Sequence, residues 1–394
     1  MRRLLSAGRV LAGPQGEVFD DGAVLVDGPV IVAVGARAEL QFAAPDVPHV
    51  HRPEGTLLPG LIDAHVHLAF VPGHELAAAV DGVDHDTLHH RMVDHMGQLV
   101  DCGVTTARDL GDCGGQTVAL RDAVTARTLT GPRLLVAGAP LTPPGGHCWF
   151  LGGEVDPDPA RLRAAVRERA AQGVDVVKVM ASGGQSTRGG AAMWERQFDE
   201  AALRVIVDEA ARHGLPVAAH AHGPDSIADS VAAGVATIEH CSWMTGFGHS
   251  EFRIDVVDAM AGSGTVACSG SAARSAALIE KVGLDRVSEL FNRMRRMADH
   301  GVPIMIGTDA GLGPFNDFPG AVVRWAQWGF DAPTMIETVT SAAAELLGLG
   351  HVTGRLAPGL AADILLVDGD PTADLTALDD IELVLARGTE RYPR

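Results

Sequence analysis

Leu58-Pro59-Gly60-Leu61-Ile62-Asp63-Ala64-His65-Val66-His67-Leu68 is an apolar run that follows a Pro-Gly breaker and ends in two histidines. Successive side chains of a β-strand point to opposite faces of the sheet, so Asp63, His65 and His67 share one face. A neutral imidazole is the commonest side-chain ligand of a metal ion. The stretch therefore predicts a buried strand whose end presents two metal ligands. Two polar residues that merely end a strand are the alternative.

Apolar runs of this kind recur along the middle of the chain and alternate with segments of helical periodicity. Eight strands are predicted, and they begin near Leu61, Gly103, Arg133, Val174, Pro216, Ala236, Gly264 and Pro303. This alternation is typical of parallel βα units, and eight units in about 290 residues favour a (β/α)₈ TIM barrel. A doubly wound open sheet is the alternative, but no glycine-rich dinucleotide loop follows an early strand.

The two ends of the chain have a different pattern, in which short strand-like runs are separated by turn residues. Residues 23–28 and 30–35 predict a hairpin near the N-terminus, and residues 362–369 and 381–385 predict two strands near the C-terminus. Neither end alone has enough strands for a stable core. We therefore expect the two ends to pair in one sheet.

Composition limits the classes of partner and compartment. The chain has 394 residues and a net charge of −19, which argues against nucleic acid and anionic membranes as partners. It contains no run of about 18 apolar residues, so no membrane span is expected. Its five cysteines are scattered without a CxxC pair, which fits reduced thiols and a cytoplasmic location.

Polar residues gather where the predicted strands end. In a (β/α)₈ barrel the C-terminal strand ends share one face, and catalytic groups lie there. Lys178, one of only two lysines in the chain, lies within an apolar strand, where an ammonium is costly to bury. The strand ends carry the metal-ligand types His65, His67, His220, His222, His240 and Asp309. Their convergence predicts a metal site.

These residues resemble the signature of the amidohydrolase superfamily. The resemblance rests on the stretch 59–67, Lys178, His220, Glu239-His240, Thr308-Asp309 and the closing segment 355–364, and it covers nearly the whole chain. It implies a metal-dependent hydrolase barrel at residues 59–351. It also implies a flanking β-sandwich that residues 1–58 and 352–394 build together.

The resemblance further implies a binuclear centre. His65, His67 and Asp309 would hold one divalent metal ion, His220 and His240 would hold the other, and Lys178 would bridge them as a CO₂-derived carbamate. Zinc fits this donor set, and manganese or cobalt are alternatives. A metal-bridging hydroxide would be the nucleophile. Asp309 and His240 would be the catalytic residues, and Asp309 would pass the proton to the leaving amine.

The substrate is less closely defined by the sequence. His222 stands where deaminases and imidazolonepropionase-type relatives usually carry glutamate, and together with Lys178 it resembles the Xaa-Pro dipeptidase branch. That branch implies hydrolysis of an amide bond in a dipeptide or N-acyl amino acid; a lactone, cyclic amide or organophosphate is the alternative. A substrate carboxylate would suit a two-point contact with arginine.

The expected substrate contacts are His147, His222 and Arg188, with Arg108, Arg196 and Arg274 as the other arginines considered. His147 lies in a loop that either lines the pocket or covers the mouth of the barrel. The only tyrosine is Tyr392, so a tyrosine contact to the substrate carboxylate is not expected. A small molecule is the expected partner, and assembly into a homo-oligomer is left open.

Overall fold

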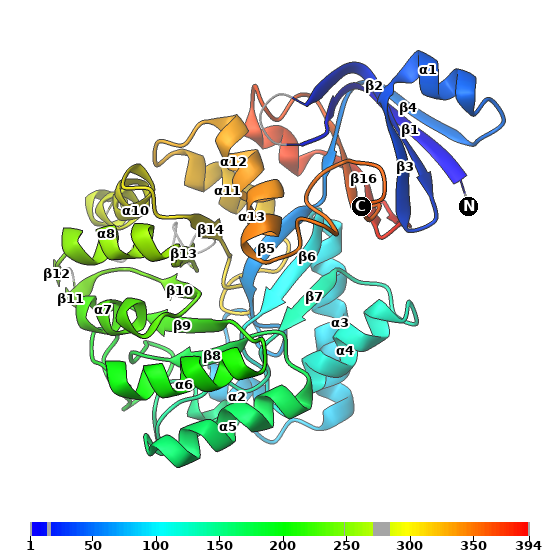
Figure 1. Ribbon diagram of the computed structural model, residues 1–394. Coiled ribbons are helices and arrows are strands. Elements are labelled where there is room, and N and C mark those ends of the chain that lie inside the picture. The colour runs from blue at the N-terminus through cyan, green and yellow to red at the C-terminus, as the bar shows by residue number, and fades with distance from the viewer. Residues whose placement is uncertain (1, 14–16, 248, 271–283, 393–394) are drawn as a thin grey trace.

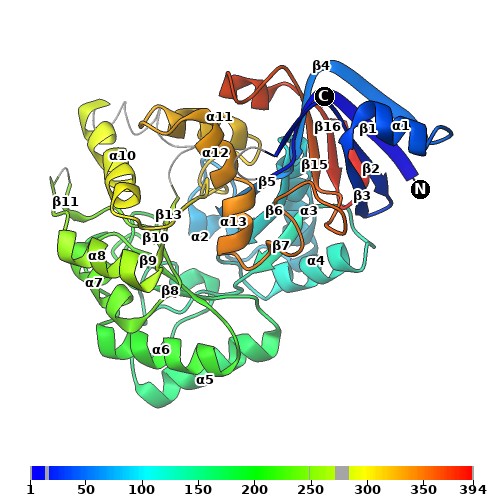
Figure 2. The ribbon, with the colours of Figure 1, turned by 45° about the horizontal axis from the view of Figure 1, so that its top comes forward.

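The structure, a computed structural model, describes residues 2–13, 17–247, 249–270 and 284–392. Figure 1 shows a body of strands wrapped by helices, and beside it a sheet built from the two ends of the chain. The strands from the N-terminus and those from the C-terminus lie side by side in every view (Figures 1 and 2). The chain therefore starts and finishes in the same sheet.

The terminal sheet has seven strands in the order β17-β16-β15-β4-β1-β2-β3. Its strands are β1 (Arg2–Leu11), β2 (Val18–Asp27), β3 (Val30–Ala36), β4 (His49–Pro59), β15 (Ile364–Asp368), β16 (Ile381–Ala386) and β17 (Thr389–Arg391). β4 joins the two ends, because it pairs in parallel with β1 and antiparallel with β15, where Leu57 lies opposite Leu366. The expected pairing of the two ends in one sheet is confirmed.

The terminal sheet has its own apolar core. Leu5, Val24 and Ile31 pack in one buried cluster with Leu366 and Leu385 from the other end of the sheet. Backbone bonds between the turn at Pro29 and the segment around residue 361 hold these two regions together. The sheet is therefore bent enough for β3, at one edge, and β16, near the other, to share one core.

Eight parallel strands form the body of the molecule, one at each of the predicted runs. They are β5 (Leu61–Val66), β6 (Val104–Asp109), β7 (Arg133–Val136), β8 (Val177–Met180), β9 (Val217–Ala221), β10 (Thr237–His240), β13 (Val266–Ser269) and β14 (Ile304–Ile306). They make two parallel sheets, β5-β6-β7 and β14-β13-β10-β9-β8. Isolated parallel bridges, Leu141 with Val179 and Val66 with Ala310, link the two sheets at both ends.

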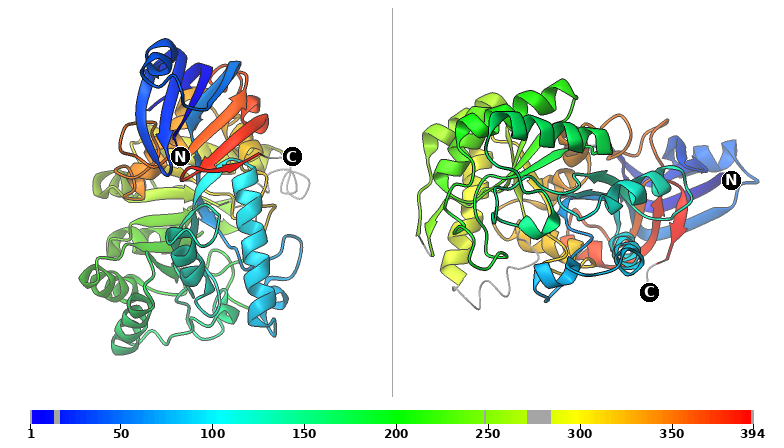
Figure 3. Two further views of the ribbon diagram at one scale, coloured as in Figure 1. Left: turned by 90° about the vertical axis from the view of Figure 1, so that its right-hand side faces the viewer. Right: turned by 90° about the horizontal axis from the view of Figure 1, so that it is seen from below.

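Helices cover the outer side of these strands (Figure 3). α5, for example, begins after Asp158, whose carboxylate accepts from the Ala160 and Arg161 amides, and it ends at Gly173 with φ of 80°. The helices are α1 (Arg37–Ala43), α2 (Leu76–Val80), α3 (His85–Asp101), α4 (Gln116–Thr125), α5 (Pro159–Gln172), α6 (Glu200–Arg212), α7 (Pro224–Ala233), α8 (Ile254–Ser263), α10 (Leu284–Asp299), α11 (Phe318–Ala326), α12 (Ala332–Thr338) and α13 (Ser341–Leu346). The short elements are η1 (Trp149–Leu151), β11 (Met244–Gly246), β12 (His249–Ser250) and η3 (Leu375–Asp379).

Helices and strands meet in one large apolar core. Side chains such as Leu99, Leu203 and Trp325 on the helices pack against Val104 and Ile306 on the strands. Within the described part of the chain, no helix is both long and apolar enough to cross a membrane. This packing fixes the strands, and the strand ends carry the site.

Candidate active site

The first ligand group lies at the end of β5 and just after β14. His65, His67 and Asp309 are buried, and their ligand atoms lie close enough together to hold one metal ion. The two Nε2 atoms are 3.3 Å apart, and Asp309 Oδ1 lies 3.6 Å from His65 Nε2 and 3.5 Å from His67 Nε2. The structure thus brings together three residues that are up to 244 positions apart in the sequence.

The hydrogen bonds on the far side of each ring define where the lone pairs are. His65 Nδ1 donates to Glu239 Oε2 at 2.9 Å, and His67 Nδ1 donates to the Gly111 carbonyl at 3.2 Å, because neither acceptor can donate. Burial holds the pKa of His67 well below its usual range, so that ring is neutral. Both Nε2 atoms therefore direct lone pairs towards each other and towards Asp309 Oδ1. Three such electron-rich atoms repel one another unless a cation lies among them.

Asp63 holds the backbone of the first ligand group in place through hydrogen bonds. Its Oδ1 accepts from the amides of His65 and Thr308 at 3.2 and 3.0 Å, and its Oδ2 accepts from Thr308 Oγ1 at 2.6 Å. Burial raises the pKa of Asp63 to about 7, against the effect of these bonds. At Gly307 a Cβ would lie 2.3 Å from the Cβ of His65, so the close approach of β14 to β5 requires glycine here. Asp63 thus ties the strand of His65 to the segment of Asp309.

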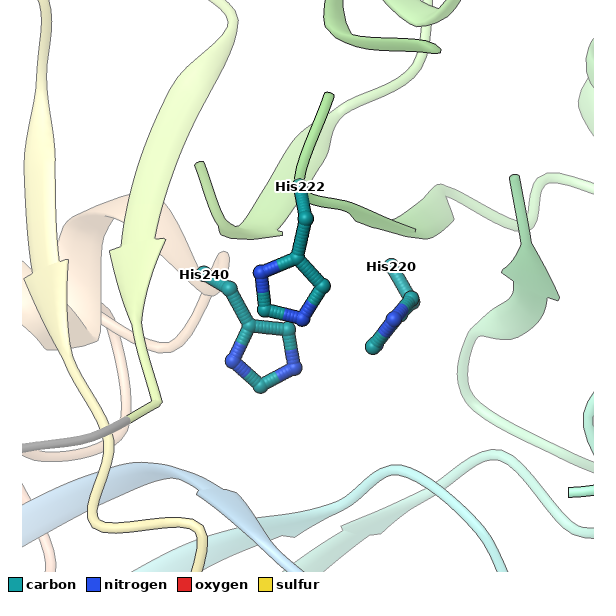
Figure 4. A group of neighbouring side chains, drawn as sticks. All are labelled: His220, His222 and His240. Carbon is teal, nitrogen blue, oxygen red and sulfur yellow. The ribbon is translucent and has the colours of Figure 1, made fainter. Parts of the chain in front are cut away.

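The second ligand group comes from β9 and β10. His220, His222 and His240 converge in the interior, with ring centroids 4.6–4.7 Å apart (Figure 4). The ring of His222 is stacked on that of His240, and Nδ1 of His222 lies 2.7 Å from Ser242 Oγ. Burial, reinforced by the neighbouring histidines, holds the pKa of His220 and of His240 well below the usual range, so both rings are neutral and can act as ligands.

The two groups adjoin each other across the interior. The ring centroids of His65 and His240 are 5.2 Å apart. Gly270, after β13, makes this approach feasible, since a Cβ there would lie 2.7 Å from the ring of His240. The structure therefore places the five histidines and Asp309 in one continuous cluster.

Lys178 on β8 is buried, and its Nζ has no hydrogen-bond partner in the described part of the chain. Burial lowers the pKa of its ammonium, and the negative charges of Glu239 and Asp309 act in the opposite direction. A buried polar group without a partner is costly, which is why each such case calls for an explanation. An amine of lowered pKa in a cluster of metal-ligand residues fits a group that binds something further.

Glu239 and Arg108 were not assigned roles in the metal site from the sequence. Glu239 accepts from His65 through one oxygen and from Arg108 through the other, at 2.9 Å in both cases. Arg108 was considered for a substrate carboxylate, but its side chain is only 3% exposed and lies inside the ring of strands. The Glu239-His240 pair was part of the family motif, so the only available signal for Glu239 was its position next to a ligand.

The residues expected to contact substrate divide into two kinds. His147 and His222 are both buried; His222 belongs to the cluster, and the ring of His147 lies 4.6 Å from that of His220. Burial lowers the pKa of each to about 3. Arg188 is not brought to the cluster, because its side chain is 88% exposed and faces Glu75 at 3.9 Å.

The structure does not put the other arginines considered from the sequence in the place of Arg188 as a contact for the substrate carboxylate. Arg196 is half exposed and pairs with Asp229 at 3.0 Å, and Arg108 is buried and hydrogen-bonded to residues of β5 and β10. Arg274 lies outside the described residues. The structure places the rings of His147 and His222 beside that of His220, and Ser242 beside His222.

Comparison with known proteins agrees with this arrangement of strands. The model of the amidohydrolase family matches residues 56–390, and the chain belongs to that family. It is a hydrolase, and its resemblance to the imidazolonepropionase-like and Xaa-Pro dipeptidase branch is confirmed.

Three known proteins illustrate what this chain is similar to. Ochratoxinase of Aspergillus niger is 25% identical over 431 aligned positions, which cover 97% of this chain and 84% of that protein. Imidazolonepropionase of Chloroflexus aggregans is 26% identical, over 90% of this chain and 86% of that protein. The crystal structure of a Xaa-Pro dipeptidase with methionine bound in its active site covers both chains completely, with 26% identity and a TM-score of 0.85.

Proposed function

We propose that this chain is a binuclear metal-dependent amidohydrolase that hydrolyses the amide bond of a dipeptide or an N-acyl amino acid. The observation that carries the proposal is the convergence of lone pairs on His65, His67 and Asp309, 3.3–3.6 Å apart with a neutral histidine among them. A second set of neutral imidazoles adjoins it. Such paired donor sets suit divalent ions of the zinc type.

In this proposal His65, His67 and Asp309 hold one ion, and His220 and His240 hold the other. When bound, the two ions lower the pKa of a shared water and polarise the scissile carbonyl. Asp309 accepts the proton of the attacking water and delivers it to the leaving nitrogen, so that the C–N bond breaks into a carboxylate and an amine. His240, the ligand nearest the first group, is the second catalytic residue.

Lys178 is proposed to bridge the two ions as a carbamate. The lone pair of its neutral amine would attack the carbon of CO₂, so that an N–C bond forms as one C–O π bond breaks; release of the nitrogen's proton to solvent would leave an anion with two oxygen donors. The lowered pKa of the amine favours the nucleophilic form, and Nζ, which has no hydrogen-bond partner among the described residues, is available to react. Arginine could not replace it, because a guanidinium stays protonated.

The substrate class follows from what borders the second ligand group. His222 and His147 are proposed to contact the substrate, and Arg188 keeps this role only as a prediction from the sequence. A relative described as a Xaa-Pro dipeptidase holds an amino acid, methionine, in its active site. Buried imidazoles beside the metal ligands could donate to a substrate carboxylate in the same region.

The same proposal extends to the architecture and the setting. We propose that the two bridged parallel sheets form a closed (β/α)₈ barrel at residues 59–351, and that the bent terminal sheet is the β-sandwich of residues 1–58 and 352–394. The five cysteines are all free, which supports a reducing, cytoplasmic setting.

Metal analysis and substrate profiling test the proposal together. Purified protein is expected to contain two divalent ions per chain and to cleave dipeptides or N-acyl amino acids. Lactones, cyclic amides and organophosphates are assayed in parallel, with Asp309→Asn as the control for contaminating hydrolases. A protein that binds no metal, or one that acts on lactones or organophosphates but on no linear amide, would contradict it.

A further inference from the structure

Arg108 on β6 is a buried arginine that spans the ring of strands. Its Nε donates to the Ala64 carbonyl on β5 at 2.7 Å. Its two terminal nitrogens donate across the interior to β10, to Thr237 Oγ1 at 3.2 Å and to Glu239 Oε1 at 2.9 Å. A buried guanidinium is costly unless its donors are met, and here three different nitrogens each have an acceptor.

Glu239 connects this arginine to the first ligand group. Its Oε1 is held by Arg108 and by the hydroxyl of Thr237, and its Oε2 accepts from His65 Nδ1 at 2.9 Å. Both oxygens of the carboxylate are thus engaged, and the side chain is fully buried. A rotation that moved Oε2 away from His65 would break the bonds at Oε1 as well.

The bond to Glu239 decides which nitrogen of His65 carries the hydrogen. Because a carboxylate only accepts, the hydrogen stays on Nδ1, and the lone pair stays on Nε2, 3.6 Å from Asp309 Oδ1. Hydrogen-bond partners of this kind orient ligand histidines and raise their basicity. The backbone contact from Arg108 to Ala64 adds a second restraint, since Ala64 directly precedes His65.

We propose that Arg108 is a positioning residue for the first ligand group, acting through Glu239 to keep His65 in the orientation and tautomer that bind metal. The inference rests on the proposed binuclear site. It assigns Arg108 an interior role in place of contact with a substrate carboxylate. We expect the larger effect at the His65 group, because Arg108 bonds Glu239, which holds the ring of His65, and its described hydrogen bonds reach no side chain of the second ligand group.

The test is a chelator-competition titration with Zn²⁺, together with the visible spectrum of the Co²⁺-loaded protein. Arg108→Met is expected to weaken one of the two equivalents about 10–100-fold, the usual effect of removing a group that orients a ligand, and to leave the other within a few-fold of wild type. Glu239→Gln is expected to affect the same equivalent. Arg108→Lys keeps the charge but not the three-way contact, so its affinity should fall between those of wild type and Arg108→Met.

Arg169→Met is the matched control. Arg169 is also buried, and its Nε donates to the Ala139 carbonyl at 2.8 Å, outside the ligand groups. Both methionine variants are expected to lower the melting temperature, but only Arg108→Met should change metal affinity and the Co²⁺ spectrum. A folded Arg108→Met protein that binds both equivalents as tightly as wild type would overturn the proposal.

Two further outcomes can also be interpreted: an Arg108→Met variant that does not fold, and a wild-type protein that binds a single ion. If Arg108→Met does not fold, Arg108→Lys and Glu239→Gln decide, and unchanged affinity for both equivalents in these two variants overturns the proposal. If wild type binds a single ion, the binuclear proposal is wrong. Weaker binding of that ion in Arg108→Met would still support the role of Arg108, whereas unchanged binding would overturn this role too.

Discussion

Replacing Lys178 tests two effects of this residue separately. One is the free energy of unfolding that its buried amine costs the protein, and the other is the metal binding that it is proposed to support. Its Nζ is buried without a hydrogen-bond partner in the described residues, and such a group costs about 1–3 kcal/mol. Lys178→Met fills nearly the same space with an apolar chain. Without metal, we therefore expect the variant to be more stable than wild type, with a free energy of unfolding about 1–3 kcal/mol higher.

Metal should reverse this order of stability. An ion at a free concentration 100 times its Kd stabilises the native state by about 2.7 kcal/mol. Wild type gains this from each ion that it holds, whereas Lys178→Met lacks the proposed bridging group and gains less. Thermal unfolding of metal-free and zinc-loaded samples of both proteins, with metal content measured on the same samples, gives the comparison.

A second variant tests the carbamate itself. Lys178→Ala leaves a cavity that a short carboxylic acid such as acetate or propionate can enter, whereas methionine in Lys178→Met occupies that space. Added acid is therefore expected to restore part of the metal content and activity to the alanine variant and none to the methionine variant. Two ions and full activity in either variant without added acid would refute the reasoning.

Three other predictions concern the same site. Asp309→Asn should fold normally and lose about 10²–10⁴-fold in kcat, the usual effect of removing an essential acid–base group; a rate within a few-fold of wild type would exclude the proton transfer proposed for it. Dialysis against a chelator should abolish activity while the far-UV circular dichroism is retained, and added Zn²⁺ should restore it; activity that survives complete metal removal contradicts the proposed chemistry. Arg188→Ala should leave kcat/KM within about twofold of wild type, since its exposed side chain lies 3.9 Å from the Glu75 carboxylate, and an exposed pair contributes little; a large rise in KM would instead support the contact predicted from the sequence.

The sequence allowed the strands and the shared face of His65 and His67 to be predicted because both follow from local pattern. A strand that is buried on both faces is apolar along its whole length, so all eight runs could be located, although β8 begins at Val177 rather than near Val174. The spacing of His65 and His67 places both rings on one face of β5. Neither inference depends on a distant part of the chain.

The interior network could not be predicted in this way. Arg108 and Glu239 are 131 positions apart, and their pairing depends on β6 and β10 facing each other across the interior. An arginine near a strand end suggests a substrate contact when only its sequence neighbours are known. The position of Arg188 could not be predicted for a different reason, because its loop has no periodicity from which the direction of the side chain could be inferred.

Backbone conformation gives an independent view of the same site. Eight described residues other than glycine have positive φ, and five of them follow strand ends around the ligand groups: Cys148, His240, Cys241, Trp243 and Asp309. Such conformations cost about 1–3 kcal/mol each and persist only where the surroundings impose them. For Asp309, with φ of 58°, the amide donates to the His65 carbonyl at 2.8 Å and the carbonyl accepts from the Leu312 amide at 3.0 Å.

At these residues the surroundings fix the direction of the side chain at the expense of the usual backbone conformation. Aspartate and histidine tolerate a left-handed conformation better than most residues, but it is still uncommon for both, and tryptophan lacks even this tolerance. At His240, with φ of 69°, the turn ends β10 and directs the ring towards His220 and His222. An extended residue here would continue the strand and move the ring away from its partners. The local cost is therefore best explained by the orientation of a ligand, which agrees with the metal site inferred from the lone pairs of the first group.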